Sequence, residues 1–361
     1  MNIAELDKNF AFKNIDRTDI EWYDIQSLPD LVFGVTYDEK LNRYMRMPQT
    51  VADSVNEGVS GLCRHTAGGR IRFKTNSSFI ALKGMIDNTG MMYHMPSTGS
   101  HGFGLYENGK YLGPLSSRFS MEAKGSDVGY SAIRNCRSNQ LKDIDIYFPL
   151  YNGVKSVFIG LQTGSVLEKP NAYPIEKPVV FYGSSITQGG CASHPGNDYE
   201  GHLCRWLGFD FINLGFSGNA KGEQEMAEYL ATLDASVYVL DYDHNAPTVE
   251  HLQQTHYPFY KRLRALREDT PILCISKPDF DGALETNANR REIIMETVRR
   301  AKADGDKKIW FLDGEKLFGE CDRDACTVDG CHPNDLGFYR MAENIRPVLE
   351  EILKGEKGER L

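Results

Sequence analysis

The sequence predicts an α/β protein in two parts, an antiparallel β-sandwich followed by a three-layer α/β/α unit with a parallel sheet. In residues 1–170, short strand-like runs are separated by Gly, Asn, Asp and Ser turns. In residues 179–361, strand-like and helix-like runs alternate, which is typical of a parallel sheet with helices on both faces. Between them, residues 171–178 follow Pro170 and include Pro174 and Pro178, which predicts an extended linker.

In the first part, several of the predicted strands alternate polar and apolar residues. The clearest of these runs are residues 71–75, 79–82, 144–148 and 154–160. Two Asn-Gly pairs, at 108–109 and 152–153, favour hairpin turns because both residue types tolerate positive φ. We therefore expect an antiparallel β-sandwich with no long helix.

In the second part, apolar runs too short for helices alternate with longer amphipathic segments. The expected strands are residues 179–182, 209–214, 236–240, 271–275 and 308–312. The expected helices are residues 199–207, 222–232, 249–268, 288–304 and 336–353. Chemistry in such a sheet is expected beyond the carboxyl ends of the strands.

Composition excludes several classes of partner. The net charge of −9 argues against nucleic acid or an anionic membrane surface as the main partner. No apolar run approaches the roughly 20 residues of a membrane span. The N-terminus has no basic segment followed by an apolar run, so a cytoplasmic location is expected unless a secretion signal has been trimmed. The oligomeric state, including a homo-oligomer, stays open.

The eight cysteines do not form the framework of a small disulfide-rich protein. Cys321, Cys326 and Cys331 are separated by four residues each, and no CxxC pair of the kind found in zinc sites occurs. Ordinary thiols are expected, or one loop disulfide in an exported protein. Neither a metal nor a cofactor is expected.

A candidate nucleophile follows the first strand of the second part. The segment Gly183-Ser184-Ser185-Ile186-Thr187 presents Ser185 where a parallel sheet places its chemistry. It differs from the elbow of α/β-hydrolases, in which a glycine stands at the position of Thr187. Taken alone, a serine here is more often a turn or cap residue.

A candidate base stands near the last helix. Asp329 precedes His332 by three residues and can accept from its imidazole, which would hold the tautomer that a general base needs. Pro333 disfavours a helical conformation at His332, and Asn334 can cap the helix that follows.

Two further loops could supply donors to an oxyanion. Gly218 follows the second strand, and glycine lets the backbone approach a ligand closely. Asn245 follows the third strand, and a side-chain amide can donate to an oxyanion. Each alone would be an ordinary turn residue, but all four motifs in this order indicate a catalytic site.

Together these motifs resemble the SGNH (GDSL-type) hydrolase superfamily over residues 178–353. Ser184 stands where that family has aspartate, Gly218 and Asn245 match, and the Asp329 to His332 block matches in full. The resemblance implies Ser185 as nucleophile, His332 as base and Asp329 as its orienting carboxylate. It further implies an oxyanion hole from the backbone N–H of Ser185, the N–H of Gly218 and the Asn245 amide, without a cofactor.

The first part carries a second resemblance. Gly102-Phe103-Gly104-Leu105-Tyr106 is similar to the Gly-x-Asp-Leu-Tyr signature of bacterial two-domain esterases, with Gly104 in place of the aspartate. A jelly-roll domain before an SGNH domain also resembles carbohydrate esterases that deacetylate plant polysaccharides. The substrate expected from this resemblance is a small-molecule or saccharide ester, with acetyl the favoured acyl group.

Substrate contacts are expected from the loop after Ser185, which carries His194, Asn197 and Tyr199, and from His244. A solvated connector explains that loop equally well. Two other functions stay open: a GDSL-type lipase, thioesterase or acyltransferase acting on a non-sugar substrate, and a carbohydrate-binding protein whose hydrolase domain has drifted.

Overall fold

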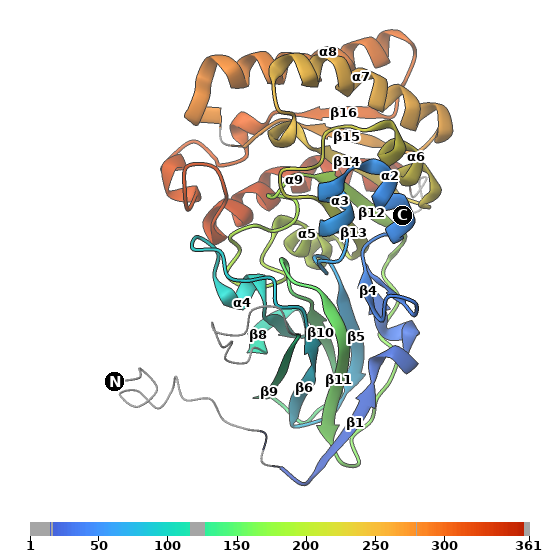
Figure 1. Ribbon diagram of the computed structural model, residues 1–361, viewed down its shortest axis with the longest axis vertical. Helices are drawn as coiled ribbons and strands as arrows, with labels where there is room; N and C mark the ends of the chain where they lie inside the picture. The colour runs from blue at the N-terminus through green and yellow to red at the C-terminus, as the bar shows by residue number, and fades with distance from the viewer. Residues whose placement is uncertain (1–14, 16, 116–126, 279, 357–361) are drawn as a thin grey trace.

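The computed structural model describes residues 15, 17–115, 127–278 and 280–356. Figure 1 shows two parts stacked along the long axis, a β-rich part below and a sheet sandwiched by helices above. The order along the chain is the predicted one, antiparallel sheets first and the parallel sheet second. The fold class predicted from the sequence is therefore confirmed.

The N-terminal part consists of two antiparallel sheets packed face to face. The first has the order β1 (Ile20–Asp24), β11 (Val154–Gln162), β6 (Phe79–Ile86) and β9 (Val128–Asn135). The second has the order β2 (Val32–Phe33), β5 (Arg70–Thr75), β10 (Lys142–Tyr147), β7 (Phe103–Glu107) and β8 (Lys110–Leu115). Buried residues of both sheets, such as Phe73 and Leu82, share one core, as expected of a sandwich.

The two Asn-Gly pairs behave differently. Asn108 and Gly109 have φ of 49° and 72° and join β7 to β8 in a hairpin, as predicted. The hairpin expected at Asn152-Gly153 is wrong, because β10 and β11 belong to different sheets. Asn152 is instead buried, and its side chain donates to the Asp87 carbonyl at 2.7 Å while the chain crosses between the sheets.

Short elements interrupt the N-terminal part. They are the hairpin β3 (Thr36–Asp38) and β4 (Arg43–Met45), the 3₁₀ turns η2 (Ile25–Ser27) and η3 (Pro29–Leu31), and the helices α2 (Gln49–Val55), α3 (Glu57–Leu62) and α4 (Ser97–Ser100). Figure 1 shows α2 beside α6 (Gln224–Thr232) of the second part. Ala52 of α2 and Val59 of α3 share a core with Tyr182. Helices this short have no periodic signal and depend on tertiary burial, so the sequence did not reveal them.

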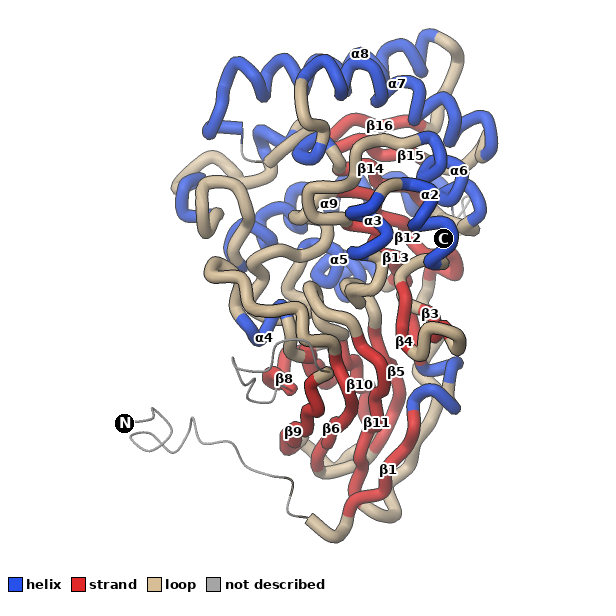
Figure 2. Tube along the Cα trace, in the orientation of Figure 1, coloured by secondary structure: helices blue, strands red, loops and turns tan. Residues whose placement is uncertain are grey.

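The C-terminal part contains a five-stranded parallel sheet. Its order is β13 (Phe209–Gly215), β12 (Ile175–Gly183), β14 (Val237–Asp241), β15 (Ile272–Ile275) and β16 (Ile309–Leu312). One face packs against α5 (Tyr199–Leu207) and α9 (Asp335–Glu356). The other packs against α6 (Gln224–Thr232), α7 (Val249–Leu266) and α8 (Leu284–Ala303). Figure 2 shows the strands between these two helical layers.

The segment expected as a linker already contains the start of β12. The strand begins at Ile175 and includes Pro178, so a proline lies in a strand that has neighbours on both sides. The ladder with β13 is irregular between Ile175 and Val179, which accommodates the missing N–H of Pro178. The Pro178 carbonyl still accepts from Ser236 N–H at 2.9 Å.

Two buried arginines of the N-terminal part cover the outer edge of the parallel sheet. An edge strand presents unpaired backbone carbonyls, and β13 is such a strand. Arg46 donates to the Gly215 carbonyl at 2.5 Å, and Arg70 donates to the Phe211 carbonyl at 3.4 Å. Arg70 also forms an ion pair with Asp210. These contacts dock the two parts and close the sheet edge.

A buried histidine predicts acid sensitivity of the fold. His256 in α7 is buried, and burial lowers its pKa to about 4. An unfolded histidine has a pKa of about 6.5, so the unfolded chain binds one more proton between these values. We expect the free energy of unfolding to fall as pH drops from 6.5 to 4, with His256 contributing up to ~1.4 kcal/mol per pH unit. In urea titrations over this range, His256→Gln should lose that share of the slope; an unchanged slope would contradict this prediction.

Candidate active site

The turn that carries Ser185, residues 183–187, begins at a position where only glycine fits. We call this segment the nucleophile turn. A Cβ on Gly183, at the end of β12, would lie 2.0 Å from Thr187 Oγ1 and 2.5 Å from the Asp241 carbonyl. The next residue, Ser184, is buried, and its Oγ accepts from Ile186 N–H at 3.1 Å. The serine that replaces the family aspartate therefore caps the turn, which holds Ser185 just beyond the strand.

Three side chains from two distant segments form one hydrogen-bonded line. Ser185 Oγ lies 2.9 Å from His332 Nε2, and His332 Nδ1 lies 2.8 Å from Asp329 Oδ2. Ser185 is buried, with 7 % of its surface exposed, whereas the His332 side chain is 21 % exposed. A hydroxyl, an imidazole and a carboxylate in this order can activate the hydroxyl as a nucleophile.

Hydrogen bonds keep Asp329 ionised. Burial raises the pKa of this carboxyl, but the backbone N–H groups of His332 and Cys331 and the His332 imidazole outweigh that cost and lower it to about 2. Both N–H groups donate to Asp329 Oδ1, at 2.8 and 3.1 Å. At neutral pH, Asp329 is therefore a carboxylate whose Oδ2 accepts from the imidazole.

The loop that carries His332 is a closed turn. Thr327 and Pro333 form an isolated antiparallel bridge, and Val328 N–H donates to the His332 carbonyl at 2.9 Å. Gly330, with φ of 86°, reverses the chain at the tip. The cap predicted for the following helix is confirmed, because Asn334 Oδ1 accepts from Gly337 N–H at 3.1 Å.

Two backbone N–H groups predicted as oxyanion donors have no acceptor among the residues that the structure describes. Across the described residues, the N–H groups of Ser185 and Gly218 donate to no protein acceptor, although those of Ile186, Ser217 and Asn219 all do. Gly218 has φ of 72°, and nothing lies within 4 Å of where its Cβ would be. Free backbone N–H groups can donate to an oxyanion.

Asn245 is held toward the same turn. Its Nδ2 donates to the Phe216 carbonyl at 2.7 Å, and since an amide has two N–H donors, one remains for a ligand. Its own turn, η4 (Asp243–Asn245), is clamped from α8 by Arg290. The Arg290 guanidinium donates to the carbonyls of Asp243 and Ala246, both at 2.7 Å, and forms an ion pair with the Asp243 carboxylate.

The N-terminal part also supports the nucleophile turn. Tyr151 donates its hydroxyl to the Ser185 carbonyl at 3.0 Å. The Gln188 side chain donates to the Leu150 carbonyl and accepts from Ser217 N–H, both at 3.1 Å. Tyr151, Gln188 and Arg290 were not predicted from the sequence, because no motif marks a residue that acts only through tertiary contacts.

The four residues predicted to contact substrate lie in different environments. Tyr199 does not fit that role, because it is fully buried and donates to Asp241 Oδ2 at 3.2 Å. His194 stacks on Tyr111 of β8, with 3.6 Å between ring centroids. Asn197 is partly exposed, and its backbone N–H bonds to the His194 carbonyl. His244 Nδ1 lies 3.8 Å from Cys331 Sγ, which places His244 beside the loop that carries His332.

The loop after Ser185 is not a solvated connector. Most of residues 188–199 are buried. The segment contacts the N-terminal sheets, since His194 stacks on Tyr111 of β8 and the Pro195 carbonyl lies against Gly104 of β7. A Cβ on Gly104 would lie 2.2 Å from the Pro195 carbonyl. Gly104 therefore lacks the aspartate side chain of the related signature because this loop occupies the space.

A buried thiol near the site is not a competing nucleophile. All eight cysteines are free. Burial, with smaller contributions from Asp329 and Cys331, raises the pKa of Cys191 to about 12. Since the thiolate is the reactive form, Cys191 stays a neutral thiol at neutral pH.

Comparison with known proteins identifies the family. The sequence profile of the GDSL-like lipase/acylhydrolase family matches residues 176–350, and that of the N-terminal domain of SGNH-hydrolase-type esterases matches residues 20–167. A Bacteroides ovatus protein described as a GDSL-like lipase is 31 % identical, over 93 % of this chain and 98 % of its own, with a TM-score of 0.80. The chain belongs to the GDSL-like lipase/acylhydrolase family. The resemblance seen in the sequence is confirmed, and the protein is a hydrolase of this family.

Two further structures share the fold of this GDSL-like hydrolase at lower identity. A salicylyl-acyltransferase from a tetracycline biosynthetic pathway is 18 % identical, covering 94 % of this chain and 96 % of its own, with a TM-score of 0.72. A family two carbohydrate esterase from Clostridium thermocellum is 14 % identical, covering 89 % and 98 %, with a TM-score of 0.59. A search of curated proteins finds no match. No helix among the described residues is long and apolar enough to cross a membrane.

Proposed function

We propose that this GDSL-like hydrolase removes short acyl groups, acetyl in particular, from a carbohydrate. The observation that carries the proposal is the line from Ser185 Oγ through His332 to Asp329, with distances of 2.9 and 2.8 Å. The free N–H groups of Ser185 and Gly218 and the Asn245 amide support it. Structural relatives described as carbohydrate esterases support the saccharide as substrate class.

The reaction follows from this geometry. Ser185 Oγ attacks the ester carbonyl while His332 Nε2 takes its proton, and Asp329 stabilises the imidazolium through Nδ1. The carbonyl oxygen becomes an oxyanion, which the Ser185 and Gly218 N–H groups and the Asn245 amide would stabilise. When the tetrahedral intermediate collapses, the C–O bond to the alcohol breaks and His332 returns the proton to the leaving oxygen. Water then attacks the acyl-serine by the same route and releases the acid.

The role of Asn245 predicts a defined loss of rate. Asn245→Ala should lower kcat for 4-nitrophenyl acetate by about 10²–10³-fold with little change in KM, because the lost donor acts in the transition state. Steady-state kinetics measures both constants. Asn289→Ala, which changes an exposed asparagine of α8, is the control and should keep the wild-type kcat. A loss confined to KM would assign Asn245 to ground-state binding instead.

The acyl preference tests the substrate class. Release of 4-nitrophenol from its acetate and octanoate esters should favour the acetate, and acetylated xylan, mannan and small sugars should then release acetic acid. A preference for octanoate would replace the saccharide ester by a lipid or thioester substrate. An inactive wild-type protein would favour a carbohydrate-binding role for the whole chain.

Acyl transfer is a second candidate. The structural relative described as an acyltransferase has a TM-score of 0.72, higher than the 0.59 of the carbohydrate esterase. Transfer uses the same residues, with an acceptor alcohol in place of water in the second step. Product analysis with and without an added sugar alcohol separates the two reactions: an acylated acceptor formed faster than free acid would favour transfer.

A further inference from the structure

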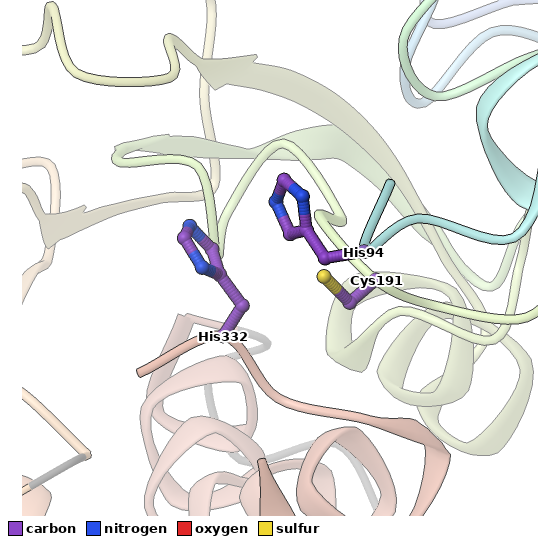
Figure 3. A group of neighbouring side chains, drawn as sticks. All are labelled: His94, Cys191 and His332. Carbon is purple, nitrogen blue, oxygen red and sulfur yellow. The ribbon is translucent and has the colours of Figure 1, made fainter. Parts of the chain in front are cut away.

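A second histidine and a thiol lie beside the proposed base. His94 lies between β6 and α4 in the N-terminal part, and its ring centroid is 5.5 Å from that of His332. Figure 3 shows the Cys191 side chain pointing between the two imidazole rings. The three side chains come from three separate segments, so only the docked fold brings them together.

The three ligand atoms of His94, Cys191 and His332 all lie within 4.8 Å of one another. Imidazole nitrogen and cysteine sulfur are the ligands that Zn²⁺ prefers, in tetrahedral sites that three protein groups and one further ligand can complete. We propose that these three residues bind a zinc-like divalent cation, and that the bound cation blocks His332 as the base. This site was not foreseen from the sequence, where the spacing of the cysteines argued against metal.

The surroundings of His332 suit a metal ligand. Asp329 Oδ2 accepts from Nδ1 at 2.8 Å, so the neutral imidazole presents the lone pair of Nε2 on its other side. Carboxylate groups orient zinc-bound histidines in this way. The same contact that prepares His332 for proton transfer therefore prepares it for a cation.

The other two residues have features that their packing alone does not require. Across the described residues, His94 Nδ1 is buried without a hydrogen-bond partner, although it is a strong donor or acceptor. Cys191 has φ of 75°, a conformation that costs energy for any residue with a Cβ. A cation would use one nitrogen of His94 and the Cys191 thiol, two of the three ligand atoms that lie within 4.8 Å of one another.

Binding would be incompatible with catalysis. The cation would bond to His332 Nε2, which otherwise lies 2.9 Å from Ser185 Oγ and takes its proton. On binding, two nitrogen–metal bonds and one sulfur–metal bond form, and the Cys191 thiol releases its proton to solvent. No electron is transferred, so removal of the metal should restore activity.

Cobalt spectroscopy tests the site without depending on the proposed function. Co²⁺ added to the full chain should give the absorption of a tetrahedral thiolate complex in the wild type and in Cys321→Ser, which changes an exposed thiol. The thiolate band should be absent in Cys191→Ser and weakened in His94→Gln. A band that persists in Cys191→Ser, or no band in the wild type, would overturn the site.

Inhibition by Zn²⁺ tests whether the bound cation blocks His332 as the base. Zn²⁺, but not Mg²⁺, should inhibit hydrolysis of 4-nitrophenyl acetate reversibly, with recovery on adding a chelator. Cys191→Ser and His94→Gln should keep most of the basal activity and need at least ~10-fold more Zn²⁺ for half inhibition, with thermal melting as the check on folding. Equal inhibition of both variants and the wild type, or a rise in turnover with Zn²⁺, would overturn the inhibitory role.

Discussion

Ser185→Ala should abolish ester hydrolysis, with a fall of about 10⁶-fold in kcat for 4-nitrophenyl acetate if the triad acts as a unit. In the proposed mechanism the Ser185 hydroxyl forms the acyl intermediate, and it is placed 2.9 Å from His332 Nε2. In a stopped assay for 4-nitrophenol, the variant should release no more product than the spontaneous hydrolysis of the uncatalysed blank. The folded state should be unaffected, because the change removes one oxygen.

Ser184→Ala is the matched control for this experiment. Ser184 is the neighbouring serine, but it is buried and its Oγ accepts from Ile186 N–H. Loss of the Ser184 hydroxyl should lower the free energy of unfolding, because the turn would lose one capping hydrogen bond. It should lower kcat only modestly. If Ser184→Ala were the inactive variant and Ser185→Ala the active one, the nucleophile would be misassigned.

The ion pair between Arg70 and Asp210 should dominate the docking of the two parts. The Arg70 side chain is fully buried, whereas that of Asp210 is 24 % exposed. Asp210→Asn leaves a buried guanidinium unpaired and should lower the free energy of unfolding by about 3 kcal/mol. Arg70→Met should cost less, because water can solvate the remaining carboxylate. Urea unfolding followed by tryptophan fluorescence measures both.

A double-mutant cycle makes this asymmetry decisive. Arg70→Met/Asp210→Asn should be more stable than the sum of the single losses predicts, because no unpaired charge remains buried. The exposed pair Lys169–Asp30 is the control, with side chains 74 % and 68 % exposed. Removal of this exposed ion pair should not measurably change the free energy of unfolding. If Asp210→Asn and Arg70→Met lowered the free energy of unfolding equally, the unpaired buried guanidinium would not be the main cause of the destabilisation.

The parallel sheet and the loops that carry the candidate site could be predicted because their signals are local. Each predicted strand of the second part lies within a few residues of an observed one, and α5 has the predicted bounds. Ser185, Asn245 and His332 follow β12, β14 and β16, where the strand ends meet. The three-residue spacing of Asp329 and His332 was sufficient to predict their contact, because a tight turn brings such residues together.

Other features depended on contacts between distant segments. The burial of Tyr199, the sheet crossing at Asn152-Gly153 and the docking of α2 and α3 on the parallel sheet have no local signature. The same holds for Tyr151 beneath Ser185 and for His94 beside His332, which lie 34 and 238 positions apart in the chain from the residues they approach.

The sequence by itself therefore determined the two-part α/β architecture and the residues able to form a serine nucleophile, its base and an oxyanion hole. Strand period, turn chemistry and short motifs act over a few residues, so they can be read along the chain. Tertiary structure alone decided how Arg46 and Arg70 cover the sheet edge and which N-terminal residues reach the nucleophile turn. Those contacts depend on burial and close approach between segments, which sequence spacing does not encode.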